Sequence, residues 1–388
     1  MSLLPLRLTL PTLIMLWATL ATGFSSPASA IPAPVPAPPP VAGNSHVLID
    51  HHSGRVLAEN QPDLRVEPAS ITKLMTSYVV FHALASGELK LDDPVRISEK
   101  AWRMPGSRSF VEVGKSVPAE VLLKGMIVQS GNDASVALAE HLAGTETAFA
   151  TLMNHHAELL GLTNTHFMNA TGLPDPDHYT TARDVAALSR ALINEFPEYY
   201  AWYAVKKFSY NGIDQYNRNR LLWRDETVDG LKTGHTEAAG YCLAATALRD
   251  DMRLISVVMG TDNENARESA SQALLNYGFR FFQTYRLYGA GEGLTTAPVW
   301  KADRDTVAVG IEEPLYVTIP RGQYESLEAT ITLNELITAP IGLEQSVGTA
   351  RVMLHEELLA ERPLYPLEPV PEGGLWRRLR DEVLLLWQ

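Results

Sequence analysis

The residues with the clearest chemical potential are Ser70 and Lys73, which open an apolar run of helical length. On a helix, a spacing of three residues places two side chains about 60° apart on one face, so the lysine amine would reach the serine hydroxyl. A serine needs a base to take its proton, and an amine desolvated among apolar neighbours can have a pKa low enough for that role. Since a chain of this length contains about one Ser-x-x-Lys by chance, the pair needs support from elsewhere.

Two further patterns supply polar groups that such chemistry needs. Ser130-Gly131-Asn132 follows an expected helix end and offers a hydroxyl and an amide in a tight turn. Lys232-Thr233-Gly234 lies in a strand-like run, where Gly234 leaves space for a substrate backbone. A given tripeptide such as Lys-Thr-Gly occurs by chance in only about one chain in twenty of this length. The three patterns in this order are close to the set found in penicillin-binding proteins and class A β-lactamases.

The segments around these patterns resemble the low-molecular-mass penicillin-binding proteins that are D-alanyl-D-alanine carboxypeptidases. The similarity rests on Val128–Ala134, Asn217-Arg218-Asn219 and Asp229–Thr236, and it extends from about His46 to the C-terminus. It implies an α+β fold, the D,D-peptidase and serine β-lactamase fold with an antiparallel sheet and helices. A small all-β domain and a C-terminal amphipathic helix would follow. It also implies a serine-type carboxypeptidase that acts on peptidoglycan stem pentapeptides and is inhibited by β-lactams such as penicillins.

The catalytic roles follow from what this chemistry needs. Ser70 would attack the carbonyl between the two terminal D-alanines and form an acyl-enzyme, with Lys73 as the base. Ser130 and Lys232 would relay a proton to the departing D-alanine amine. By resemblance, the backbone N–H groups of Ser70 and His235 would form the oxyanion hole, in which each donor is worth about 2.7–4 kcal/mol.

The substrate-binding roles are implied by the resemblance alone. Asn132 would hydrogen-bond the substrate amide, and Thr233, beside Gly234, would contact the terminal carboxylate. Arg218 and Arg267 would supply positive charge near that carboxylate, although Arg267 equally suits a solvated helix start. The sequence predicts no cofactor and no metal.

Three alternatives remain open. A β-lactamase or a D,D-endopeptidase would share the fold, and a catalytically silent cell-wall binding protein would belong to another class. A β-lactamase needs an efficient deacylating base, and the candidates Glu158, Asp175 and Asp177 form no convincing pattern. The intact serine, lysines and asparagine argue against a silent protein.

Composition excludes other classes. The chain has a formal net charge of −13 and no basic block, which argues against nucleic acid as a partner. Its single cysteine, Cys242, cannot form an intrachain disulfide and lies in a strand-like run, so we expect a buried structural thiol. The adjacent histidines at 51–52 and 155–156 have the wrong spacing for a metal site.

The chain ends suggest export and attachment to a membrane surface. Residues 1–30 read as a signal peptide with the small-x-small motif Ala28-Ser29-Ala30, although an uncleaved anchor is the alternative. Residues 31–44 form a Pro-rich linker. The segment 372–388 predicts an amphipathic helix too short and too charged to span a bilayer, with apolar residues on one face. We expect it to lie in the membrane interface, at the periplasmic face of the inner membrane, although it could instead dock on the protein itself.

Between these ends we expect a catalytic domain over residues 45–285 and a β-rich domain over residues 286–371. The first should open with a hairpin of strands 46–49 and 55–58. Its expected helices start at Ser70, Pro118 and Thr145. Another is expected over residues 134–143, with Asp133 as its N-cap, and two more over residues 181–194 and 265–285. Its late strands are expected at 207–213, 228–234, 240–248 and 252–260. The β-rich domain has expected strands at 307–309, 315–318, 329–333 and 348–354.

Overall fold

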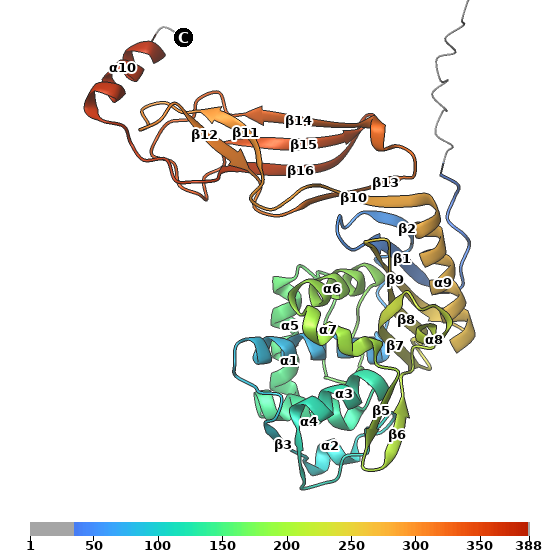
Figure 1. Cartoon of the computed structure of the whole chain (residues 1–388). Coiled ribbons are helices and arrows are strands. Elements are labelled where there is room, and N and C mark those ends of the chain that lie inside the picture. The colour runs from blue at the N-terminus through green and yellow to red at the C-terminus, as the bar shows by residue number, and fades with distance from the viewer. Residues whose placement is uncertain (1–34, 387–388) are drawn as a thin grey trace, which may run out of the picture. The chain divides into compact units, whose positions relative to one another are not determined.

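The computed structural model describes residues 35–386 (Figure 1). Its first sheet is antiparallel and has five strands in the order β2-β1-β9-β8-β7. The strands are β1 (Ser45–Asp50), β2 (Val56–Asn60), β7 (Val228–Thr236), β8 (Gly240–Arg249) and β9 (Met252–Thr261). An early hairpin therefore pairs with three late strands, which confirms the predicted α+β class and places β7 at a sheet edge.

Helices and short hairpins occupy the sequence between β2 and β7. The helical elements are η1 (Ala69–Thr72), α1 (Lys73–Ala85), α2 (Glu99–Arg103), α3 (Ala119–Gln129), α4 (Asn132–Ala143), α5 (Glu146–Leu159), α6 (Ala182–Glu195), α7 (Pro197–Tyr200), η2 (Ala201–Ala204) and α8 (Leu221–Arg224). Two short antiparallel pairs lie among them, β3 (Pro94–Arg96) with β4 (Ser116–Pro118), and β5 (Lys207–Tyr210) with β6 (Ile213–Tyr216). The larger helices cover one face of the sheet, and α9 (Glu264–Phe281) covers the other (Figure 1).

The two faces of the sheet have separate hydrophobic cores because successive strand residues point to opposite sides. In β9, Val257 packs in the core on the side of α1, whereas Val258 packs with Leu274 and Leu275 of α9. Cys242 of β8 is fully buried in the first core, and burial raises the pKa of its thiol to about 11. The predicted structural cysteine is thereby confirmed.

α1 runs through the interior and is buried on every side. Every residue from Lys73 to Phe81 is buried, so the helix carries its polar side chains into the core. A buried polar side chain needs a hydrogen-bond partner, and the Thr76 hydroxyl donates to the carbonyl of Ala170 at 2.8 Å. As expected, the chain leaves the helix at Gly87, whose φ of +76° suits glycine. The amine of Lys73 thus starts from a buried helix, not from a solvated surface.

One predicted strand is wrong. The sequence predicts a single strand over residues 207–213, but β5 ends at Tyr210 and the chain turns back at Ile213 to form a hairpin with β6. The turn is Asn211-Gly212, in which both residues have positive φ, +50° and +73°. Asn-Gly between two apolar runs is a strong hairpin signal, and it takes precedence over the continuous strand pattern.

Two predicted helix ends are also wrong. α4 begins at Asn132 with Gly131 at its N-cap, so Asp133 lies inside the first turn and does not cap it. The Asp133 carboxylate instead accepts a hydrogen bond from the backbone N–H of the distant Ser109 at 2.7 Å. The helix predicted over residues 265–285 is α9, which ends at Phe281. Residues 282–288 instead form strand β10 (Phe282–Tyr288), whose aromatic and β-branched residues favour pairing with β13 (Leu315–Pro320).

The C-terminal region is all-β, as predicted, with its own core. β10 pairs with β13 (Leu315–Pro320), and a five-stranded sheet has the order β11-β12-β16-β15-β14. Its strands are β11 (Gly293–Pro298), β12 (Thr306–Gly310), β14 (Leu327–Leu333), β15 (Gly348–Leu354) and β16 (Glu357–Pro366), with η3 (Tyr324–Ser326) before β14. Val309, Val352 and Leu364 are fully buried in this core. β11 and β16 were not predicted, and two prolines in β16 obscure its strand pattern.

The last described helix is α10 (Leu375–Leu385). No helix within residues 35–386 is long and apolar enough to cross a bilayer. The predicted signal peptide, residues 1–30, lies outside the described residues.

Candidate active site

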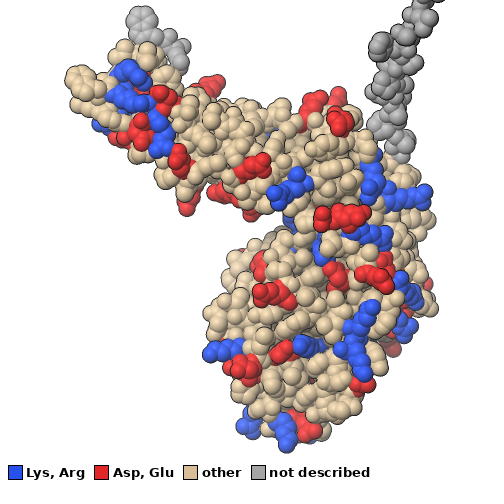
Figure 2. All heavy atoms as spheres, in the orientation of Figure 1, with Lys and Arg blue, Asp and Glu red and all other residues tan. Residues whose placement is uncertain are grey.

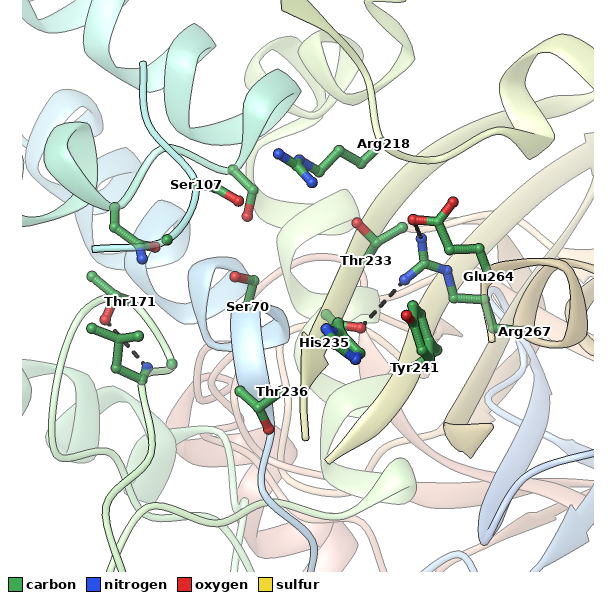
Figure 3. Close-up of a pocket in the computed structure, with 16 residues that line it drawn as sticks. Ser70, Ser107, Thr171, Arg218, Thr233, His235, Thr236, Tyr241, Glu264 and Arg267 are labelled. Atoms are coloured by element: carbon green, nitrogen blue, oxygen red, sulfur yellow. Dashed lines mark hydrogen bonds and ion pairs between the residues drawn. The ribbon is translucent and has the colours of Figure 1, made fainter. Parts of the chain in front are cut away.

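A cavity of about 390 Å³ lies where the start of the helical region meets the edge strand β7 (Figure 3). Seven of the nine predicted site residues line it, namely Ser70, Ser130, Asn132, Arg218, Thr233, Gly234 and His235. The other two, Lys73 and Lys232, lie behind its wall, with only 1% and 2% of their surfaces exposed. The structure therefore brings together all nine residues, which come from segments far apart in the sequence.

Ser70 sits in η1, the short 3-10 turn that precedes α1. The residue before it, Ala69, has a φ of +47°, which is uncommon for a residue with a side chain. Two glycines pack closely on this turn. A Cβ on Gly172 would lie 1.7 Å from the carbonyl oxygen of Ala69, and a Cβ on Gly234 would lie 3.0 Å from that of Pro68. The position of the serine thus depends on close backbone contact from two sides.

The Lys73 amine has three oxygen neighbours. Its Nζ lies 3.0 Å from Ser70 Oγ, 2.7 Å from Asn132 Oδ1 and 2.6 Å from the backbone oxygen of Thr171. A neutral amine has two N–H donors and one lone pair. The amide and the backbone carbonyl can only accept, so they take both N–H groups and leave the lone pair for the Ser70 hydroxyl proton. The geometry is therefore that of a base facing a nucleophile.

Burial favours the neutral form of this amine. Desolvation lowers the pKa of Lys73 to about 7, and the positive charge of Arg218 acts in the same direction. The carboxylates of Asp133 and Glu146 oppose the shift. Near neutral pH, a substantial fraction of Lys73 is therefore unprotonated.

The second lysine forms a similar pair with Ser130. Lys232 Nζ donates to Ser130 Oγ at 2.9 Å and to the backbone oxygen of Thr233 at 3.1 Å. Burial is the largest cause that lowers the pKa of Lys232, followed by the charge of Lys73. Ser130 ends α3 in the left-handed conformation, with a φ of +67°, which turns its hydroxyl into the cavity. Two hydroxyl–amine pairs consequently face one space.

Asn132 connects the helical wall to a neighbouring loop. Its Oδ1 accepts from Lys73, its Nδ2 donates to the carbonyl of Pro105 at 2.6 Å, and its backbone N–H donates to the carbonyl of Ser107 at 2.7 Å. An amide nitrogen has a second N–H, and in Asn132 this group remains available toward the cavity that the residue lines.

A loop at residues 169–173 was missed by sequence reasoning. Asn169 organises it, since its Oδ1 accepts from the backbone N–H groups of Thr171 at 3.1 Å and of Gly172 at 2.7 Å. Its Nδ2 donates to the carbonyl of Leu173 at 3.0 Å. This loop presents the Thr171 carbonyl to Lys73. Any residue type can present a backbone carbonyl, so the sequence contains no direct signal for this contact. The only local signal for the segment is the Asn-x-x-Gly turn.

Positive charge and aromatic rings form another part of the wall. Arg218 donates from Nε to the carbonyl of Gln129 at 3.0 Å, and Arg267 donates from Nη1 to that of Gly234 at 3.4 Å. Burial lowers the pKa of both arginines. The His235 and Tyr241 rings lie 4.0 Å apart, with the Arg267 guanidinium 5.5 Å from the centre of Tyr241 (Figure 3). This wall suits an anionic group.

The three acids considered as deacylating bases, Glu158, Asp175 and Asp177, do not line the cavity. The acid that does line it is Glu264, beside Arg267 (Figure 3). Within residues 35–386, no group of three or more His, Cys, Asp or Glu side chains is placed to hold a metal ion.

Comparisons with known proteins agree with this geometry. Residues 33–263 match the family model described as D-alanyl-D-alanine carboxypeptidase, and residues 282–372 match the C-terminal domain of penicillin-binding protein 5. The chain is 42% identical over 386 residues to the D-alanyl-D-alanine carboxypeptidase DacA of Escherichia coli strain K12, with 96% of each chain covered.

Solved structures of penicillin-binding proteins also align with this chain. Penicillin-binding protein 5 of Haemophilus influenzae aligns with a TM-score of 0.83 and 40% identity, covering 87% of this chain and 100% of that one. Penicillin-binding protein D2 of Listeria monocytogenes in its ampicillin-bound form aligns with a TM-score of 0.57 and 29% identity, covering 62% of this chain and 98% of that one.

The low pKa of Lys73 predicts a pH profile. The neutral amine is the base, so the rate of Ser70 acylation by a fluorescent penicillin should rise as pH increases through about 7 and level off above about pH 8. Below the pKa, each pH unit should lower the rate about tenfold. Lys73→Arg should abolish acylation across this pH range, and with it the rise in rate, because a guanidinium stays protonated and cannot act as the base. A flat profile from about pH 5.5 to about pH 8.5 would contradict a titrating base.

The contact between Gly172 and Ala69 predicts a second result. Gly172→Ala should lower the acylation rate at least about tenfold, because the new Cβ must displace the turn that carries Ser70. Gly161→Ala is the matched control, since Gly161 has a similar φ of +70° but nothing within 4 Å of its would-be Cβ. Both variants incur the backbone cost, roughly 1 kcal/mol. Equal loss of activity in the two variants would rule out a specific role for the contact.

Proposed function

The chain belongs to the D-alanyl-D-alanine carboxypeptidase family, and we propose that it removes the terminal D-alanine of peptidoglycan stem pentapeptides through an acyl-enzyme on Ser70. It is a serine peptidase of that family. The observation that carries the assignment of Ser70 is the Lys73 amine, whose N–H groups are taken by two carbonyl acceptors while its remaining contact is Ser70 Oγ at 3.0 Å.

In the proposed acylation, Ser70 Oγ attacks the carbonyl carbon of the penultimate D-alanine while Lys73 takes the hydroxyl proton. Negative charge forms on the carbonyl oxygen, and the backbone N–H groups of Ser70 and His235 stabilise it. The C–N bond then breaks, and the departing amine receives a proton through Ser130, supported by Lys232. The 2.9 Å contact between these two groups supports that relay.

The substrate backbone is proposed to lie along β7. An edge strand has free N–H and C=O groups, and an extended peptide can pair with them. The free N–H of Asn132 Nδ2 would bind a substrate carbonyl from the opposite wall. The terminal carboxylate would lie against the Thr233 hydroxyl, with Arg218 and Arg267 nearby. Gly234 lets β7 lie close to the turn that carries Ser70, because a Cβ at this position would lie 3.0 Å from the carbonyl oxygen of Pro68.

The absence of a contact between the cavity and the acids Glu158, Asp175 and Asp177 favours a peptidase over a β-lactamase. A β-lactamase must hydrolyse its acyl-enzyme rapidly, which calls for a carboxylate base in addition to Lys73. Without a carboxylate base, a penicillin acyl-enzyme would persist, and the enzyme would be inhibited. The ampicillin-bound structure of penicillin-binding protein D2 from Listeria monocytogenes supports β-lactams as ligands of this fold.

We also propose that the protein is exported and held peripherally at the periplasmic face of the inner membrane by α10. The helix docks through its polar side, because the carboxylate of Asp381 is 3% exposed and accepts from the backbone N–H of Lys301 at 2.7 Å. Its apolar side faces outward, with Trp376, Leu379 and Leu386 exposed by 85%, 50% and 81%.

Basic side chains gather in the region of α10, together with acidic ones, in the space-filling view (Figure 2). Apolar residues with adjacent arginines suit the interface of an anionic bilayer. Docking on the protein's own surface was the alternative for this helix. Here its charged side contacts the protein and its apolar side does not, which supports the membrane proposal.

The acyl-enzyme predicts a covalent adduct. Labelled penicillin should add to Ser70 in a peptide identifiable by mass spectrometry, and Ser70→Ala should remove the adduct, whereas Ser86→Ala should retain it. The unmodified enzyme should release D-alanine from a pentapeptide, and penicillin should block that release. Rapid turnover of penicillin without D-alanine release would instead identify a β-lactamase. A failure to form any adduct would overturn the Ser70 mechanism.

The exposed face of α10 predicts the behaviour of a second variant. Trp376→Gln combined with Leu379→Gln should shift the protein from the pellet to the supernatant in sedimentation with anionic lipid vesicles, because the apolar contact with the bilayer is lost. The matched control is Leu336→Gln with Leu343→Gln, two similarly exposed leucines elsewhere in the β region. Pelleting that is unchanged by the first pair would exclude α10 as the anchor.

A further inference from the structure

A carboxylate lies inside the region proposed to bind the substrate carboxylate. Glu264 lines the cavity, and its side chain approaches Arg267 with a closest N···O distance of 3.7 Å (Figure 3). Its charge also acts on Arg218, since it opposes the lowering of the Arg218 pKa that burial causes. The same two guanidinium groups are therefore already exposed to one negative charge before a substrate arrives.

The negative charge of Glu264 is stabilised without any help from the cavity. The residue is the first of α9, where the partial positive charge of a helix N-terminus favours an anion. On its outer side, the Glu264 carboxylate forms an ion pair with Arg220 at 3.0 Å. Groups outside the cavity therefore hold the Glu264 side chain in place.

Arg267, in turn, does not depend on Glu264 for its position. Arg267 as a whole is 3% exposed, and its guanidinium packs over Tyr241 and donates to the Gly234 carbonyl. The 3.7 Å approach to Glu264 is longer than a hydrogen bond, so it contributes charge and little geometry. Removing the carboxylate should leave Arg267 where it is and make it a stronger anion site.

We propose that Glu264 is a specificity-determining residue, an internal anion that competes with the C-terminal carboxylate of the substrate for Arg267 and Arg218. This inference rests on the proposed carboxypeptidase function. Glu264 weakens the binding of every ligand that carries a carboxylate at this position, including the released D-alanine. Its effect is therefore on binding, and the chemical step at Ser70 is left unchanged.

The test compares Glu264→Gln with the unmodified enzyme on an N-acylated tripeptide ending in D-Ala-D-Ala. We expect KM to fall about threefold to tenfold with kcat nearly unchanged, and the inhibition constant of free D-alanine to fall by a similar factor. The same peptide with a C-terminal amide should show no gain, because it lacks the competing charge. Asp262→Asn is the matched control, since Asp262 is an exposed acid two residues away that does not line the cavity.

Each outcome separates the competing explanations. A raised KM in Glu264→Gln would mean that the carboxylate positions Arg267, and an equal gain with the amide peptide would mean a general change of the cavity. Either result, or an unchanged KM, overturns the inference while leaving the carboxypeptidase function intact. Failure of the unmodified enzyme to release D-alanine from the acid peptide would overturn the proposed function itself. Thermal unfolding of each variant checks that the N-terminus of α9 is preserved.

Discussion

The burial of two lysine amines in one cavity wall is the constraint on which the rest of the site depends. Moving a charged amine out of water costs several kcal/mol, so a buried lysine either pairs with a carboxylate or gives up its proton. Lys73 and Lys232 lie among hydroxyl, amide and backbone oxygens. Among the ion pairs within residues 35–386, none includes either lysine. The oxygens satisfy the N–H groups without stabilising a full charge, which is the environment that a basic amine needs.

The fold meets this constraint with a buried helix and close backbone contacts. α1 is apolar enough on all sides to enter the core, and it carries Lys73 with it. The serine then has to reach the cavity from the start of the same helix, which the 3-10 turn and the positive φ of Ala69 allow. Gly172 and Gly234 approach that turn more closely than other residues could. The unfavourable conformations are held because the surrounding packing leaves no alternative.

Sequence reasoning found the side chains of the site and most of its elements, since motif, period and turn residues are local signals. The hairpin of β1 and β2, the buried Cys242 and strand β15 were all predictable in this way. What it missed depends on tertiary contact. The Thr171 carbonyl acts through its backbone, and Asp133 binds a loop instead of capping its helix. The hairpin at Asn211 was missed for another reason, because its turn signal was present and was outweighed by the apolar pattern on either side.

The charges of the cavity link substrate binding to proton transfer. After burial, the charge of Lys73, when it is protonated, and the charges of Arg218 and Arg267 lower the pKa of Lys232. A substrate carboxylate bound between the two arginines would offset part of that field and raise the proton affinity of Lys232. The proton that Lys73 takes from Ser70 could then pass toward Ser130 and Lys232, where the departing amine needs it. In the empty cavity, burial and neighbouring positive charge lower the pKa of both amines, whereas a bound carboxylate would favour the extra proton at the step that uses it. The carboxylate of the peptide would thus help to set the protonation state in which its own terminal residue is released.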